Sequence, residues 1–338
     1  MVSTERAPSE STEPARPPVS QSLSNFVRRQ FRDQNVRTVA LVYGLTAALI
    51  IVATFLTHGT RSPDLTWSIV LFASVTAVVA YGQGIVVLTR GFDLSIPSVL
   101  TLGGVLLTSL SGGSNLAAIW AIPLVLFVGA GAGFFNGVGV AYLRISPIVM
   151  TLASSVIIDG IIQLSTNAAY KREAPPVLTG LMEGHAFGMP WIVLFIAVFT
   201  VAGSVVLHKT TFGRQVYAVG NSEWAAFLSA IRVRSILISV YMVSGVCAAL
   251  GGMMLAGYAH RSYLGMGAPY LLPSVAAVVI GGTSVLGGRG TYIGTLAGAL
   301  LLTALSTLLD SFAAPSAVKT IVLGISVLAA ALISSRRS

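Results

Sequence analysis

The chain has 338 residues, of which 54% are hydrophobic and only 9% are charged, and its mean hydropathy is +0.84. Soluble domains carry about 25% charged residues, so this composition excludes an ordinary soluble domain and predicts an integral membrane protein. The net charge of +9 comes from basic residues that punctuate apolar runs, which indicates membrane topology and argues against a nucleic-acid-binding surface.

The first segment, residues 1–35, is rich in Ser, Pro, Glu and Arg and has few large apolar side chains. Burial within it cannot offset the entropy of ordering the chain. The first apolar run begins near residue 38 and is too long for the apolar core of a signal peptide. We therefore expect a disordered cytoplasmic tail over 1–35 and a transmembrane domain over 36–338.

Ten apolar runs follow, most of them close to the length of about 17–25 residues that a helix needs to cross the hydrocarbon core. The third, eighth and ninth are short or interrupted by glycine, so we expect these to be bent, broken or partly re-entrant. The sequence thus predicts an all-α polytopic membrane protein. The runs lie near 38–57, 67–89, 94–111, 115–142, 147–166, 189–208, 235–258, 271–287, 290–310 and 316–334.

The distribution of Lys and Arg predicts the orientation, because these residues collect in cytoplasmic segments. Ten crossings that start from a cytoplasmic N-terminus place most of the 20 Lys and Arg residues on the cytoplasmic side. Both termini are then expected to be cytoplasmic. The basic residues that this topology places on the outer side of the membrane are Arg61, Lys171, Arg172, Arg261 and Lys319.

The stretch GFDLSIPSVLTLGG, residues 91–104, places Asp93 between two apolar runs. A carboxylate in the membrane is costly unless it has a function. The expected topology puts Asp93 at the cytoplasmic end of its span, where it would not need deep burial. There Asp93 or Ser95 could cap the third helix, with Pro97 in its first turn. The other interpretation is that Asp93 lines the gate or the substrate pathway.

Polar residues inside the fourth and fifth spans are further candidates for the substrate pathway. Asn136 lies between closely spaced glycines, and Asp159, Gln163 and Thr166 share one face of a helix at positions i, i+4 and i+7. Such residues face an aqueous path or the interior of a helix bundle, where they also form hydrogen bonds between helices. Both alternatives are open for Asn136 and for the face with Asp159.

Two connections between spans are longer than a turn. The outer one, 166–190, could dock an external partner or could be a solvated loop. The inner one, 209–234, contains a predicted amphipathic helix that begins after Gly220 with Asn221 as its N-cap and Glu223 in its first turn. Its apolar residues Trp224, Phe227, Leu228 and Ile231 follow at helical spacing, with Arg214 and Arg232 on either side.

This helix has two interpretations. It could rest its apolar face on lipid headgroups, or it could insert into a groove of a cytosolic protein.

The glycine-rich run GGTSVLGGRGT, residues 281–291, resembles a phosphate-binding loop only in the spacing of its glycines. Gly288 and Arg289 occupy the positions where Lys and Ser or Thr would follow, which argues against nucleotide binding. Its glycines are expected to break a helix and to permit close packing. With a single cysteine and no HExxH motif, we expect neither a metal site, a cofactor nor a catalytic residue. The glycines with this expected structural role are Gly281, Gly282, Gly287, Gly288 and Gly290.

Four segments together resemble one family, the inner-membrane permeases of bacterial ABC sugar importers of the ribose type, within the superfamily of branched-chain amino acid and sugar permeases. GFDLSIPSVLTLGG resembles the family's Gly-Ile-Asp-Leu-Ser signature, with Ile96 and Pro97 in place of the usual Val-Gly. The cytoplasmic segment departs from the family at Trp224, Phe227 and Ala230, where Ala or Glu, Arg and Gly are more usual. The other three segments are FFNGVGVAYLRISPIVMTLASSVIIDGI, TTFGRQVYAVGNSEWAAFLSAIRV and AAVVIGGTSVLGGRGTYIGTLAGALL.

The resemblance implies a fold similar to type II ABC importers and a division of labour between subunits. Two permeases, identical or related, would form the pore, with lipid around them. Two cytosolic ABC ATPase subunits would bind the cytoplasmic face, and a periplasmic or extracellular sugar-binding protein would deliver a monosaccharide such as ribose or xylose. Residues 221–231 would then be the coupling helix. The rival hypothesis is an ion-coupled secondary transporter or channel for a small polar solute, which needs no ATPase.

Overall fold

The structure, a computed structural model, describes residues 37, 39–51, 63–166, 172–186 and 188–335. The expected tail over 1–35 lies outside these residues. Apolar helices occupy all ten predicted positions, so the all-α class is confirmed. These helices are Val39–Ile51, α2 (Pro63–Leu88), α3 (Ile96–Ser111), α4 (Asn115–Ala141), α5 (Pro147–Thr166), α7 (Trp191–Lys209), α10 (Val233–Tyr258), α11 (Leu271–Ile280), α12 (Tyr292–Ser311) and α13 (Ser316–Ser335).

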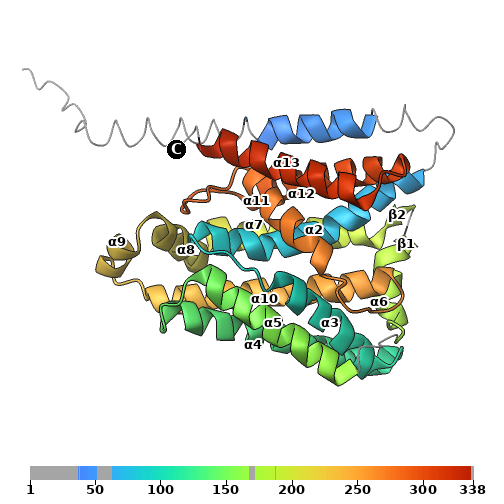
Figure 1. Cartoon of the computed structure of the whole chain (residues 1–338), viewed down its shortest axis with the longest axis horizontal. Helices are drawn as coiled ribbons and strands as arrows, with labels where there is room; N and C mark the ends of the chain where they lie inside the picture. Colours follow the sequence, from blue (N-terminus) through green and yellow to red (C-terminus); the bar gives the residue numbers. More distant parts are fainter. Residues whose placement is uncertain (1–36, 38, 52–62, 167–171, 187, 336–338) are drawn as a thin grey trace, which may run out of the picture.

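Short elements lie at the two ends of the long helices (Figure 1). We call the end that carries α8 (Thr211–Asn221) and α9 (Glu223–Leu228) the α9 end. The other end carries α6 (Pro176–Glu183) and an antiparallel hairpin that the sequence did not predict. The hairpin pairs β1 (His185–Ala186) with β2 (Met189–Pro190). The short helix η1 (Ala268–Tyr270) follows Gly267, which packs against Pro97 at the start of α3.

Within the part of the chain that the structure describes, six helices are long and apolar enough to cross a membrane: α2, α4, α5, α7, α10 and α12. The short length expected for the third and eighth runs is observed, since α3 has 16 residues and α11 has 10. The expected interruption of the ninth run is wrong, because α12 is continuous. Its glycines Gly294 and Gly298 lie against Gly281 and Ala277 of the preceding segment, so they permit close packing and do not bend the helix. The number of crossings stays a prediction.

The helix α10 is the centre of the packing and contacts α2, α3 and α4 along its length. The contacts with α3 and α4 depend on small residues, as expected where backbones approach closely in a membrane. A Cβ at Gly252 of α10 would collide with the carbonyl oxygen of Leu100 on α3. Gly245 of α10 approaches Gly129 on α4 in the same manner. This packing fixes the positions of α3 and α4 relative to α10.

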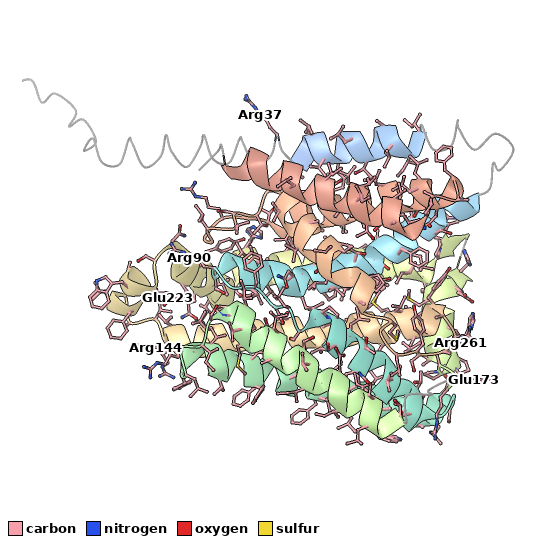
Figure 2. The ribbon with its side chains drawn as sticks, in the orientation of Figure 1. Arg37, Arg90, Arg144, Glu173, Glu223 and Arg261 are labelled. Atoms are coloured by element: carbon pink, nitrogen blue, oxygen red, sulfur yellow. The ribbon has the colours of Figure 1, made fainter. Side chains whose placement is uncertain are left out.

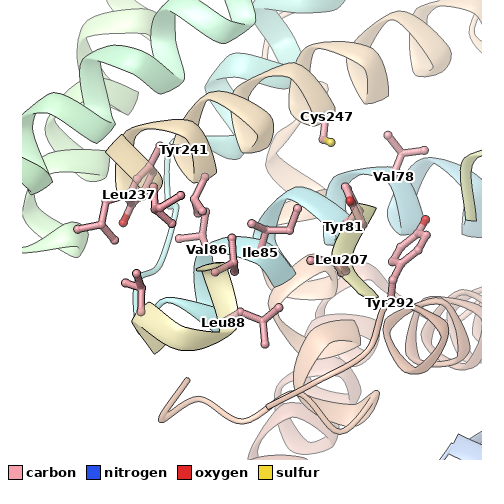
Figure 3. Close-up of a cluster of buried hydrophobic side chains, with 14 of the residues drawn as sticks. Val78, Tyr81, Ile85, Val86, Leu88, Leu207, Leu237, Tyr241, Cys247 and Tyr292 are labelled. Atoms are coloured by element: carbon pink, nitrogen blue, oxygen red, sulfur yellow. The ribbon is translucent and has the colours of Figure 1, made fainter. Parts of the chain in front are cut away.

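Aromatic side chains join α2, α7 and α12 on the other side of α10 (Figure 3). Tyr81 packs edge-to-face against Tyr292, with 4.7 Å between ring centroids, and its hydroxyl donates a hydrogen bond to the carbonyl of Gly203 at 3.2 Å. Cys247 is buried in the same cluster, where it acts as a small apolar side chain. The buried core therefore extends from α3 and α4 across α10 to α12.

We expect Gly252→Ala to destabilise the protein by about 1–3 kcal/mol, because the added methyl group meets backbone atoms that cannot move aside independently. The matched control is Gly131→Ala on α4, where an added Cβ meets nothing within 4 Å. The midpoint of thermal unfolding of the purified protein in detergent should fall for Gly252→Ala and stay level or rise for Gly131→Ala. Equal midpoints for the two variants would contradict the close α3–α10 packing.

Candidate functional site

The segment predicted to hold one helix, 221–231, instead contains the short helix α9, which spans only Glu223–Leu228. The predicted N-cap, Asn221, is wrong: Asn221 is the last residue of α8, and its side-chain amide donates to the carbonyl of Tyr217 at 2.8 Å. Ser222 is the N-cap, because its extended backbone separates the two helices and its Oγ accepts from the amide of Ala225 at 3.2 Å.

The end of α9 reverses the chain sharply. Ala230 has a φ of +59°, a conformation that favours glycine, and the amide of Ile231 donates to the carbonyl of Ala226 at 3.1 Å. Ile231 therefore turns back and packs against the buried core, half-buried. The prediction that Ile231 extends the apolar face of the helix is wrong, because the helix ends before it.

The apolar face of α9 consists of three exposed side chains. Trp224, Phe227 and Leu228 are 69%, 60% and 68% exposed, and the rings of Trp224 and Phe227 stack at 6.0 Å. Of the polar residues expected around these side chains, only two lie close to them. Glu223, the first residue of α9, and Arg232, four residues after its end, line a cleft. Arg214 instead lies at the start of α8 and donates to the carbonyl of Lys209 at 3.3 Å. The structure thus presents a compact aromatic tip at one end of the molecule.

Three segments meet directly behind α8, at a point we call the junction: Leu88–Arg90 after α2, Gly220–Asn221 at the end of α8, and Gly287–Gly290 between α11 and α12. Arg90 donates from Nε to the carbonyl of Gly220 at 2.8 Å and from a terminal nitrogen to that of Asn221 at 2.6 Å. These bonds place a cation at the C-terminal end of α8, where the helix dipole favours it. The junction attaches α8 to α2 through an arginine side chain.

The glycine-rich run supplies the third part of the junction. Gly282, Gly287 and Gly288 have φ values of +86°, +78° and +70°. The amide of Gly288 donates to the carbonyl of Leu88 at 2.9 Å, and a Cβ there would collide with Asn221. Glycine is therefore required both for the backbone conformation and for the close approach.

The two outer glycines of this run occupy its ends. Gly281 ends α11 and packs against Gly294, and Gly290 accepts a hydrogen bond from the hydroxyl of Tyr217 at 2.7 Å. The contact from Tyr217 is a second link between α8 and the loop. The run thus joins α11 and α12 to α8.

Asp93 lies in the connection between α2 and α3 and is only 1% exposed, so the expectation that it avoids deep burial is wrong. Its Oδ1 accepts from the amide of Ser95 at 3.0 Å and from the hydroxyl of Ser95 at 2.6 Å, and its Oδ2 accepts from the hydroxyl of Ser244 at 2.6 Å. Burial raises the pKa of the Asp93 carboxyl, and these hydrogen bonds oppose the rise. Ser95 is the N-cap residue of α3 but makes no side-chain cap hydrogen bond.

Asn136 belongs to the same buried network. Its side-chain nitrogen donates to Ser95 Oγ at 2.8 Å, and its Oδ1 is a buried acceptor without a partner among the described residues. The network therefore connects α3, α4 and α10 through Asn136, Asp93 and Ser244. It lies at the start of α3 and reaches Ser244 near the middle of α10, so the network is inside the helix bundle, and Asp93 follows Arg90 of the junction by three positions.

The polar residues predicted to share one face of α5 differ in how deeply they are buried. Thr166 is buried and donates to the carbonyl of Ile162 of its own helix at 2.7 Å. Asp159 is half-buried and Gln163 is exposed, and neither makes a side-chain hydrogen bond within the part of the chain that the structure describes. Polar groups on this side of α5 would contact lipid in an isolated chain, a costly arrangement.

Sequence reasoning missed two residues that organise this end. In the sequence, Arg90 is recognisable only as a basic residue that marks the cytoplasmic side of the membrane. Nothing in the neighbouring residues indicates that it caps a helix 130 positions away. Ser244 lies in a run of small residues of α10 that predicts packing only. A hydroxyl partner for Asp93 could have been sought among such residues, but the choice needs the three-dimensional arrangement.

Comparison with known proteins identifies the family. Residues 65–331 match the model described as branched-chain amino acid transport system / permease component. The ribose import permease protein RbsC of Escherichia coli K12 is 35% identical over 274 residues, which cover 78% of this chain and 83% of that protein. The autoinducer 2 import system permease protein LsrC of Yersinia enterocolitica is 37% identical over 238 residues, which cover 70% and 66%.

A third relative is the galactose/methyl galactoside import permease protein MglC of Haemophilus influenzae, which is 30% identical over 252 residues, 69% of this chain and 75% of that protein. No solved structure matches the chain. The relatives and the apolar helices together place the chain in the inner membrane as a multi-pass protein. The chain belongs to the family of branched-chain amino acid transport system permease components.

Proposed function

We propose that the chain is the membrane-spanning permease of an ATP-binding-cassette importer and moves a monosaccharide, such as ribose or xylose, or a related solute, across the inner membrane. ATP is hydrolysed by a separate subunit, and access alternates between the two sides. Relatives named as permeases for ribose, autoinducer 2 and galactose import support the solute class. The observation that carries the proposal is the exposed aromatic tip of α9 together with the junction behind it.

The tip has the form of a docking element. Trp224, Phe227 and Leu228 expose more than half of their surfaces, yet the helix that carries them is only six residues long. In this proposal the ATPase subunit covers them, and Ala226 anchors the helix from its buried side. The α9 end is then cytoplasmic, which agrees with Arg90, Arg144 and Arg232 lying there (Figure 2).

The junction provides a route from the tip to the spans. A displacement of α9 by the ATPase moves α8, and Arg90 transmits that movement to α2 while Gly288 transmits it to the loop between α11 and α12. The cycle of ATP binding and hydrolysis would drive this displacement. Rigid-body motion of helices around such a contact is a common form of alternating access.

The substrate pathway is proposed to run along α5, beside a second permease protomer. Asp159 and Gln163 face away from the core formed by α3 and α4, and a second copy or water must cover them in a bilayer. Asp93 and Asn136 act on this pathway by positioning α3 and α4, because their side chains are buried in the network with Ser95 and Ser244. Copurification identifies whether the second protomer is an identical or a related chain.

The opposite end is proposed to receive a solute-binding protein. There the helix α6 is held firmly, since the amide of Val177 donates to Asn115 Oδ1 at 2.7 Å and that of Ala174 to the carbonyl of His260 at 2.9 Å. The side chains of Glu183 and His260 approach to 3.1 Å. A partner that docks on α6 would thus push directly on the C-terminal end of α10.

We expect Phe227→Ala/Leu228→Ala to abolish solute uptake in proteoliposomes that contain the ATPase and the solute-binding protein. The permease should still insert and purify normally, because both side chains are exposed. The matched control is Val198→Ala/Val201→Ala on α7, which truncates two side chains of similar exposure, 61% and 65%. Normal uptake by the α9 variant would contradict the coupling role, and ATP-independent uptake would favour an ion-coupled transporter.

Cysteine labelling tests the pathway, because the only native cysteine is buried in α10. In a Cys247→Ser background, Gln163→Cys should react with a membrane-impermeant thiol reagent. Leu164→Cys is the matched control: Leu164 is 84% exposed in the chain but lies about 100° away around the helix, toward lipid. Equal reaction at both positions, or none at Gln163→Cys, would contradict an aqueous path along this face.

A further inference from the structure

A cleft of about 1280 Å³ opens at the α9 end. Its walls come from four places: the connection after α2, the turn between α4 and α5, the helix α9, and the first turn of α10. The proposed transport function uses the outer face of α9 and the junction, and it assigns nothing to this cleft. The cleft adjoins both, because Trp224 and Phe227 of the tip and Arg90 of the junction form part of its lining.

Basic residues dominate the polar lining of the cleft. Arg90, Arg144, Arg232 and Arg234 contribute to it, and Glu223 is the acidic residue among the lining residues. Within the described residues, Arg144, Arg232 and Arg234 form no ion pair with a carboxylate. Guanidinium groups gathered without acidic partners create a positive potential that favours an anion.

The arginines are held in place. Arg144 has a φ of +55°, which fixes its backbone in a turn between α4 and α5. The guanidinium of Arg234 stacks over the ring of Tyr142, 5.1 Å from the ring centroid. Arg90 is fixed by its two bonds to the carbonyls of α8. Arg90 and Arg234 therefore lose less side-chain entropy when they bind a ligand.

Neutral donors add to this charge. The first residues of α5 and α10, Pro147 and Val233, both lie on the lining, so the positive ends of two helix dipoles are directed at the cleft. Tyr241 also lines the cleft, and its hydroxyl is a buried group without a hydrogen-bond partner among the described residues. That hydroxyl is closed off from the cleft, so the two helix ends are the groups that reinforce the charge of the arginines.

We propose that this cleft binds the phosphate group of an anionic membrane lipid. The guanidinium fork matches phosphate oxygens in geometry as well as in charge. Apolar side chains directly outside the turn, Leu143, Ile148 and Val149, are 67%, 47% and 59% exposed and can lie against acyl chains. Basic pockets between transmembrane helices are a recurrent site for anionic headgroups.

Native mass spectrometry of the full-length permease in detergent, without its partners, measures this binding directly. The probe is phosphatidic acid, and phosphatidylcholine is the zwitterionic comparison. We expect adducts of phosphatidic acid that weaken by about tenfold or more in Arg144→Gln/Arg234→Gln, because each basic residue contributes to the attraction. Arg261→Gln, which removes one positive charge at the opposite end (Figure 2) and so matches the single variant Arg144→Gln in charge, should leave binding unchanged.

Further arms separate the alternatives. Arg144→Lys/Arg234→Lys keeps both charges and should retain most of the binding, and size-exclusion profiles show whether each variant is folded. If the double Gln variant does not fold, Arg144→Gln alone carries the comparison. Equal binding of phosphatidylcholine, or unchanged binding in the folded Gln variant, would overturn the proposal. Displacement by equimolar glycerol 3-phosphate would overturn a lipid as the source and assign the cleft to a soluble phosphate ester.

Discussion

The two hydrogen bonds from Arg90 to the last carbonyls of α8 hold together the end of the molecule on which the proposed function depends. Without them, α8 and α9 would be attached to the spans mainly by the chain itself and by the contacts of Tyr217 and Asn221 with the glycine loop. A bidentate contact from a cation to a helix C-terminus is strong and directional. The short helix α9 can therefore project an exposed apolar tip and still act as a rigid lever.

Buried polar groups and small residues continue this rigidity into the membrane. The network of Asp93, Ser95 and Ser244 ties the start of α3 to α10, and Asn136 extends it to α4. Gly252 and Gly245 then let α3 and α4 lie directly on the backbone of α10. A movement that enters at α8 thus meets a closely packed set of helices. By contrast, α5 packs mainly on α3 and α4, and its outer face, with Gln163 and Leu164, is exposed.

Periodicity and composition predicted the helix positions well, because apolar runs of bilayer length are a strong signal. They were wrong where a single backbone angle decides the outcome. The extended conformation of Ser222 makes Ser222, and not Asn221, the N-cap of α9, and the positive φ of Ala230 ends α9 before Ile231. Asp93 was misjudged for another reason. One of the two hydroxyls that bond its carboxylate, that of Ser244, lies 151 positions away in the chain, and no local pattern records such a partner.

In the proposed mechanism, Arg90 transmits the movement of α8 to the spans. The most direct measurement is the number of solute molecules taken up per ATP hydrolysed by the reconstituted transporter with Arg90→Gln. We predict that the ATPase subunit still binds and still hydrolyses ATP, because the tip of α9 is intact, while uptake per ATP falls sharply. An unchanged ratio of uptake to hydrolysis in a folded Arg90→Gln protein would contradict the account.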